Sequence, residues 1–182
     1  MLGKYISFKN FKSKNNDFNK KKITKIFKNL LKQDGQILNS FTTKYKDSYS
    51  KKLILKLKKK NTVILIGMGG SILGARAIHN FLIPKVKKFF FIDSFQKKLN
   101  LSNKRLNIIV SKSGNTLETI SNTNILINKN QMNLFITENK NSYLLNLAKK
   151  LKSDVVHHNN FIGGRYSVLS EVGMLPAELM GF

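Results

Sequence analysis

The order of apolar and polar residues along the chain changes character near residue 60. Before that point, apolar side chains recur at helical spacing between Lys22 and Lys32, and Gly35 follows as a helix stop. A second helix is expected from about Gln36 to Lys59, where apolar side chains drift along one face. The pattern therefore predicts an N-terminal helical segment over residues 1–59.

From residue 60 onward, short apolar runs rich in β-branched residues alternate with helix-length stretches. The predicted strands are Thr62–Ile66, Phe89–Ile92, Asn107–Val110, Asn133–Ile136 and Asp154–His157. Strands that are apolar throughout and joined by helices indicate a parallel sheet covered on both faces. The sequence therefore predicts an α/β fold, a three-layer Rossmann-like arrangement around a five-stranded parallel sheet. Ligands of such folds bind at the carboxyl ends of the strands.

Composition narrows the class of protein. A chain of 182 residues has room for one domain with a core, and no apolar run approaches the roughly 18 residues of a membrane-spanning helix. The first residues lack a long apolar segment with a cleavage site, so a secretory signal is not expected. The chain has no cysteine, which fits a reducing compartment. We therefore expect a cytoplasmic protein with no membrane partner.

The formal net charge of +24 raises the alternative of a nucleic-acid-binding protein. The lysines are spread through every segment, however, and the only arginines are Arg76, Arg105 and Arg165. Specific nucleic-acid sites usually use arginine. The charge is better explained by a drift in surface composition, which an anionic substrate would tolerate or exploit through steering. Nucleic acid is therefore not the expected partner.

A glycine-rich turn, Gly67–Gly74, follows the first predicted strand. A dinucleotide-binding turn would need the pattern G-x-G-x-x-G and an acid about 20 residues later, a place that Asp93 could fill. Ile72 stands where the third glycine belongs, so a nicotinamide oxidoreductase is only an alternative. A nucleoside-triphosphate loop fails because the required Lys and Ser or Thr do not follow Gly74. The turn is therefore interpreted as one whose amides and Ser71 hydroxyl face an anion.

A hydroxyl-rich turn follows the third predicted strand and opens a helix. Its hydroxyls belong to Ser111, Ser113 and Thr116, with Gly114 between them. A phosphate monoester has three terminal oxygens, which hydroxyls and free helix N-terminal amides satisfy without a metal. An ordinary helix cap, the alternative, would need only one such residue. The two turns together predict a pocket for a small phosphorylated sugar, with neither a metal nor a cofactor.

These turns resemble the phosphosugar-binding fold called the sugar isomerase (SIS) domain, in which a Ser-x-Ser-Gly-x-Thr loop holds phosphate. Both are similar to the corresponding turns of the glucose-6-phosphate isomerase (phosphoglucose isomerase) family. A third motif, Ile162–Ser170 followed by Val172–Pro176, resembles the Gly-Gly-Arg-Phe/Tyr-Ser segment that distinguishes that family from other phosphosugar binders. The resemblance covers residues 66–176. It implies a SIS domain over residues 60–160, with residues 161–182 starting the connection to a second SIS domain.

The resemblance also implies roles for individual residues. The groups that would hold the 6-phosphate are the amides and hydroxyls of Ser111, Lys112, Ser113 and Thr116, and those that would line the sugar are Gly70 and Ser71. Arg165 would approach the C1 and C2 oxygens and stabilise an enediolate, unless it forms a structural ion pair. Glu118 is a weak candidate for the general base, because its place in a first helical turn also suits a loop-orienting role. His157 and His158 are interpreted as structural residues.

The implied activity is the aldose–ketose isomerisation of glucose 6-phosphate and fructose 6-phosphate in glycolysis and gluconeogenesis, by metal-free acid–base chemistry. Complete enzymes of the family are expected to be homodimers whose second domain carries the base. The chain is therefore expected to be an amino-terminal portion that binds a phosphorylated hexose without isomerising it. A non-catalytic phosphosugar-binding module and a bifunctional glucose/mannose-6-phosphate isomerase remain alternatives. The apolar stretch Val172–Phe182 is expected to lie exposed and to promote self-association.

Overall fold

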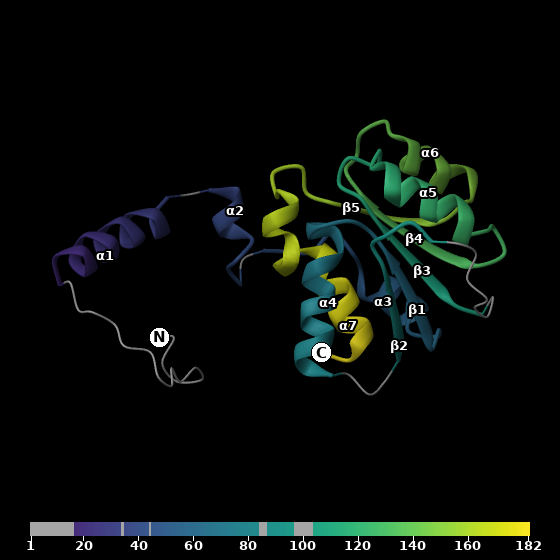
Figure 1. Cartoon of the computed structure of the whole chain (residues 1–182), viewed down its shortest axis with the longest axis horizontal. Helices are drawn as coiled ribbons and strands as arrows, with labels where there is room; N and C mark the ends of the chain where they lie inside the picture. The colour runs from purple at the N-terminus through teal and green to yellow at the C-terminus, as the bar shows by residue number, and fades with distance from the viewer. Residues whose placement is uncertain (1–16, 34, 44, 84–86, 97–103) are drawn as a thin grey trace.

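A five-stranded parallel sheet forms the centre of the computed structural model, which describes residues 17–33, 35–43, 45–83, 87–96 and 104–182. The strand order is β2-β1-β3-β4-β5 (Figure 1). The strands are β1 (Thr62–Ile66), β2 (Lys88–Ile92), β3 (Leu106–Val110), β4 (Met132–Thr137) and β5 (Asp154–His157). Each agrees with its predicted range to within one residue at either end, so the α/β fold with a parallel sheet is confirmed.

Helices cover both faces of this sheet. Alternate residues of β1 divide between two apolar clusters, with Val63 and Leu65 in one and Ile64 and Ile66 in the other. The helices that supply the first cluster are α3 (Lys51–Leu57), α4 (Gly70–Leu82) and α7 (Glu171–Met180). Those that supply the second are α5 (Leu117–Leu126) and α6 (Tyr143–Lys150). Because strand side chains alternate between faces, this division shows the three expected layers.

The two edge strands differ from the expectation of strands buried throughout. Strands β3 and β4 are buried along almost their whole length, but β2 alternates between exposed and covered side chains, and β5 is half-buried. Phe90 in β2, for example, is 39% exposed. The expectation is wrong at the edges because an edge strand has a neighbour on one side only and less helix above and below it.

The N-terminal segment contains α1 (Asp17–Leu31) and α2 (Gln36–Asn39). The first predicted helix is confirmed, but the long second helix is wrong, because residues 40–50 separate α2 from α3. Hydroxyl groups explain the break. Ser40 Oγ donates to the Ile37 carbonyl at 2.6 Å, and Ser50 Oγ caps α3 by accepting from the Leu53 amide at 3.2 Å. Such side-chain bonds compete with helix continuation and favour helix ends.

Helix α1 lies to one side of the sheet (Figure 1). Its large apolar side chains are exposed, among them Ile23 at 64% and Phe27 at 56%. In the described parts of the chain, no helix combines the length and apolar character needed to cross a membrane.

The C-terminal segment packs against the sheet. After β5 the chain forms the 3-10 helix η2 (Gly164–Leu169) and then α7, whose Val172, Leu175 and Leu179 belong to the same apolar cluster as β1 and α4. The expectation of an exposed tail is therefore wrong for α7, although Phe182 beyond it is 53% exposed. Gly173 permits this packing, because a Cβ atom there would overlap the Val168 carbonyl group. The division of the chain at residues 59 and 160 stays a prediction.

Candidate functional site

The two polar turns lie side by side at a topological switch point of the sheet. Strands β1 and β3 are neighbours, but β1 leads into α4 on one face and β3 leads into α5 on the other. Open parallel sheets bind their ligands at such a point, outside the carboxyl ends of the strands. Gly67 at the end of β1 packs closely beside the Val110 carbonyl at the end of β3. The predicted neighbourhood of the two turns is confirmed.

The hydroxyl-rich turn is held in shape by its own hydroxyl groups. Ser111 is buried, and its Oγ lies 2.9 Å from Thr116 Oγ1 and accepts from the Gly114 amide at 3.2 Å. Gly114 has a positive φ of 65°, which glycine adopts without strain. Thr116 is the N-cap of α5 but forms no side-chain cap bond, because its hydroxyl pairs with Ser111. The first amides of α5 thus remain free for an anion.

Lys112 and Ser113 have different surroundings from the rest of this turn. Lys112 Nζ donates to the Asn160 carbonyl at 2.8 Å and lies 3.3 Å from Glu138 Oε1. Ser113 is exposed, and its Oγ accepts from the Asn115 amide at 3.3 Å. The ammonium group of Lys112 is therefore directed to the turn that follows β5.

The glycine turn meets the Gly-Gly-Arg segment. The backbone of Gly70 lies so close to the Gly164 carbonyl that a Cβ atom on Gly70 would overlap it. Ser167 Oγ donates to the Gly164 carbonyl at 2.7 Å, and the Gly70 carbonyl lies 3.4 Å from the same hydroxyl. Ser71 is half-buried in the first turn of α4. The first and third sequence motifs thus form one contact region, which sequence reasoning had not joined.

Arg165 is the second residue of η2 and is exposed. Within the described part of the chain, its side chain forms neither an ion pair nor a hydrogen bond. The structure therefore gives no support to the alternative of a structural ion pair at Arg165. Glu118, the weak candidate for the base, is half-buried in the first turn of α5.

The acid that a dinucleotide site would require has another partner. Asp93 at the end of β2 forms an ion pair of 2.7 Å with Arg76 NH1 from α4. The hydrogen bond from Arg76 holds the pKa of the Asp93 carboxyl below its ordinary value. Because the guanidinium occupies this carboxylate, Asp93 is poorly placed to bind a ribose hydroxyl, which weakens the oxidoreductase alternative further.

Sequence reasoning missed one residue of this region, the fully buried Glu171. Its Oε1 lies 2.7 Å from His158 Nδ1, and its Oε2 accepts from the Tyr45 hydroxyl at 2.7 Å. Burial by itself raises the pKa of this carboxyl, but hydrogen bonds from His158, Tyr45 and backbone amides hold it below the ordinary value. The interpretation of His158 as a structural residue fits this contact. The signal in the sequence was an acid at the first position of a mainly apolar helix.

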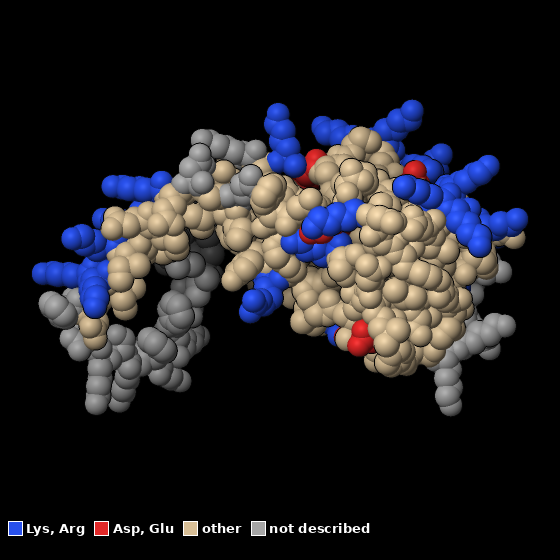
Figure 2. Space-filling view, turned by 90° about the horizontal axis from the view of Figure 1, so that it is seen from above, with Lys and Arg blue, Asp and Glu red and all other residues tan. Residues whose placement is uncertain are grey.

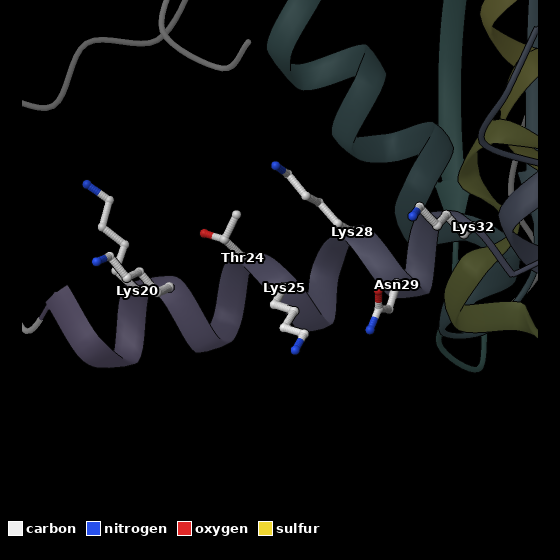
Figure 3. A pocket seen from close by; sticks show the side chains of 7 residues that line it. Lys20, Thr24, Lys25, Lys28, Asn29 and Lys32 are labelled. Atoms are coloured by element: carbon white, nitrogen blue, oxygen red, sulfur yellow. The ribbon is translucent and has the colours of Figure 1, made fainter.

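A hollow along α1 offers no comparable site. Its lining residues belong to α1, apart from Lys32 directly after it, and their side chains point to different sides (Figure 3). Lysine and arginine side chains are also spread over the surface between α1 and the opposite end of the molecule, so the positive charge of α1 is not distinctive (Figure 2). Among the described residues, no second element lines this hollow, so the switch point is the better candidate.

A family model for phosphoglucose isomerase matches residues 32–182. The chain belongs to the phosphoglucose isomerase family. The match begins after α1 and includes all five strands, both polar turns, η2 and α7. The predicted family is thus confirmed.

A curated relative agrees with this membership, and solved structures share the fold. The chain is 34% identical to a glucose-6-phosphate isomerase of Methanocaldococcus jannaschii, over 91% of this chain and 44% of the archaeal protein. A hypothetical protein from Thermus thermophilus shares the fold with a TM-score of 0.68 at 22% identity, over 91% of this chain and 45% of the other. The Vibrio vulnificus NanR protein complexed with ManNAc-6P shares the fold with a TM-score of 0.51 at 21% identity, over 71% of this chain and 51% of the NanR chain. The chain spans less than half the length of the archaeal relative.

Proposed function

We propose that this chain forms the phosphosugar-binding part of a glucose-6-phosphate isomerase. The observation that carries the proposal is the meeting of three motifs at one switch point: the hydroxyl-rich turn, the glycine turn and the Gly-Gly-Arg segment. The name of the archaeal relative supports the reaction, and the sugar phosphate in the NanR complex supports the ligand class. The complete protein would interconvert glucose 6-phosphate and fructose 6-phosphate, as a cytoplasmic homodimer.

Within this site, the phosphate would lie at the N-terminus of α5. Hydroxyls and amides of the turn would donate to its oxygens, from Ser111, Lys112, Ser113 and Thr116. Gly70 and Ser71 would border the sugar, since α4 begins beside that turn. Bound in this way, the sugar would extend from α5 towards η2, which carries Arg165.

Arg165 would act on the charge that develops during isomerisation. Moving a proton between C1 and C2 of an open-chain sugar phosphate creates an enediolate, whose oxygens carry negative charge. Since the Arg165 guanidinium has no partner among the described residues, it is available to stabilise such charge. Glu118 would orient the phosphate loop, and the proton-transferring base would come from the rest of the complete protein.

Calorimetry with two ligands tests the proposal. The purified chain should bind 6-phosphogluconate but not gluconate, because the phosphate provides most of the recognition. Equal heats with both ligands would contradict the proposed pocket. In a coupled assay the same chain should convert fructose 6-phosphate at a rate close to background, since acid–base groups supply about 10² to 10⁴-fold of the rate. Turnover comparable to that of a complete isomerase would show that the base lies within these residues, at Glu118 or at a histidine.

A further inference from the structure

A single carboxylate connects the two ends of the segment that carries Arg165. Glu171 is the first residue of α7, and one residue separates it from the end of η2. Its Oε1 accepts from the Asn159 amide at 3.0 Å and lies 2.7 Å from His158 Nδ1. Both of these partners precede η2 in the chain. The carboxylate therefore reaches back across η2 and holds the turn in front of it.

The second carboxylate oxygen is also occupied. Glu171 Oε2 accepts from the Tyr45 hydroxyl, which comes from the segment between α2 and α3. Both Glu171 and His158 are buried, at 0% and 3% exposure. A buried charge seldom improves stability over an apolar residue of similar volume, although it specifies which groups must meet. The contribution of this pair is therefore expected to lie in geometry.

The same turn also contacts the phosphate loop. The residue after Asn159 is Asn160, whose carbonyl accepts from Lys112 Nζ at 2.8 Å. The turn from His158 to Asn160 thus contacts Glu171 on one side and the hydroxyl-rich turn on the other. Arg165 has no side-chain partner in the described residues, so the position of the η2 backbone sets which part of the site its guanidinium can reach.

We propose that Glu171 is a positioning residue for Arg165. Its bonds to His158 and Asn159 fix η2 relative to the phosphate loop, so that the guanidinium reaches the C1–C2 end of a phosphosugar. A displacement of about 1 Å in such a group costs about 10²-fold in rate. This inference rests on the proposed phosphosugar function, and it assigns a role to a buried residue that does not contact the substrate.

The test compares two ligands that differ only at the end where Arg165 acts. 5-Phosphoarabinonate has a carboxylate there, which imitates the charge of an enediolate, whereas arabitol 5-phosphate has a neutral hydroxymethyl group. Calorimetry on the 182-residue chain gives the affinity ratio of the two ligands. Arg165→Ala should abolish the preference for the carboxylate. Glu171→Gln should lower the ratio about 10-fold, which corresponds to about 1.4 kcal/mol, and leave arabitol 5-phosphate binding unchanged.

Two further measurements separate positioning from general stability. In the double variant, Glu171→Gln should have no additional effect once Arg165 is Ala, because coupled residues are not additive. The matched control is Glu178→Gln, on the same helix, which accepts from the Tyr49 hydroxyl at 2.9 Å and should keep the wild-type ratio. Thermal unfolding of each variant shows which chains are folded.

If Glu171→Gln does not fold, a pair of variants at His158 decides. His158→Asn keeps a donor at the place of Nδ1 and should retain the preference, whereas His158→Ala should lose it. A wild-type chain that binds neither ligand contradicts the proposed function itself, whereas one that binds both equally contradicts the role of Arg165 and with it the inference. If the carboxylate preference depends on Arg165 but persists in folded Glu171→Gln and His158→Ala variants, the inference is overturned while the proposed function stands. An equal loss for both ligands also overturns it, since that is the effect of a purely structural residue.

Discussion

The backbone of Gly70, at the start of α4, lies directly against the carbonyl group of Gly164, at the start of η2. This contact joins two motifs that are 94 residues apart in the sequence. A glycine at position 70 is therefore required for this packing. The contact brings the Gly-Gly-Arg segment to the edge of the switch point.

Substitution of these two glycines should have different effects on stability. Gly70→Ala should destabilise the chain by about 1 to 3 kcal/mol, because its Cβ atom overlaps backbone atoms that cannot move aside. Gly164→Ala should leave the folded state nearly as stable as the wild type, because open space surrounds its Cβ position. Urea unfolding measures both free energies. Equal losses at the two positions would contradict the observed packing.

The same pair gives information about the ligand. A folded Gly164→Ala chain that no longer binds 6-phosphogluconate would show that the ligand approaches this backbone closely. Unchanged binding would place the ligand nearer to α5.

Hydroxyl groups of the phosphate loop should contribute jointly to binding. Ser111→Ala with Thr116→Ala should weaken 6-phosphogluconate binding, at about 1 to 3 kcal/mol for each charge-assisted hydrogen bond lost. Because their hydroxyls lie 2.9 Å apart, the single variants should not be additive. Calorimetry on the four chains of the cycle measures this coupling. Ser121→Ala, on the same helix but beyond the loop, is the control, and undiminished affinity in the double variant would place the phosphate elsewhere.

Acid should destabilise the chain through Glu171. The pKa of its carboxyl is lowered from 4.5 in the folded state. A group of this kind contributes stability above its unfolded pKa and loses that contribution as the pH falls through the folded pKa. The free energy of unfolding should therefore decrease below about pH 4.5 more steeply in the wild type than in Glu171→Gln. Urea unfolding between pH 7 and pH 3 measures the two slopes, and parallel curves would contradict the prediction.

Ionisation of Asp47 should lower the stability of the folded chain, the opposite of the effect expected for Glu171. Burial, followed by the charge of Glu171, raises the pKa of the Asp47 carboxyl, and its Oδ1 is buried with no hydrogen-bond partner. The ionised form therefore opposes folding once the pH exceeds the ordinary pKa. Asp47→Asn should raise the midpoint of thermal unfolding at pH 7, and the gain should shrink as the pH falls. A lower midpoint would mean that the carboxylate is better solvated than its burial indicates.

Much of this protein follows from short stretches of its sequence. The strands were predictable because β-branched apolar runs bounded by polar turns are a local signal, and β1 and β5 have the predicted bounds. The two polar turns were predictable for the same reason, since Ser111 to Thr116 contain within six residues the hydroxyls that shape the loop. Their proximity followed from the rule that parallel strands end at the same edge.

The apolar pattern was misleading where side-chain hydrogen bonds or packing against distant elements decide the structure. The apolar face from Gln36 to Lys59 suggested one helix, but Ser40 and Ser50 form bonds that end α2 and begin α3. The apolar stretch Val172–Phe182 suggested an exposed tail, because its pattern does not state which surface covers it. In the structure α3 and α4 provide that surface, so most of its apolar side chains are buried.

The fold class, the family and the residues of the polar turns could all be inferred from the sequence by itself, because each depends on the residues within short stretches of the chain. The packing of Gly70 on Gly164, and the contact through which Glu171 holds the turn before Arg165, became visible in the folded molecule alone. These contacts join residues that have no regular spacing. Their free energy comes from burial and hydrogen-bond geometry, which exist only after the sheet and its helices have assembled.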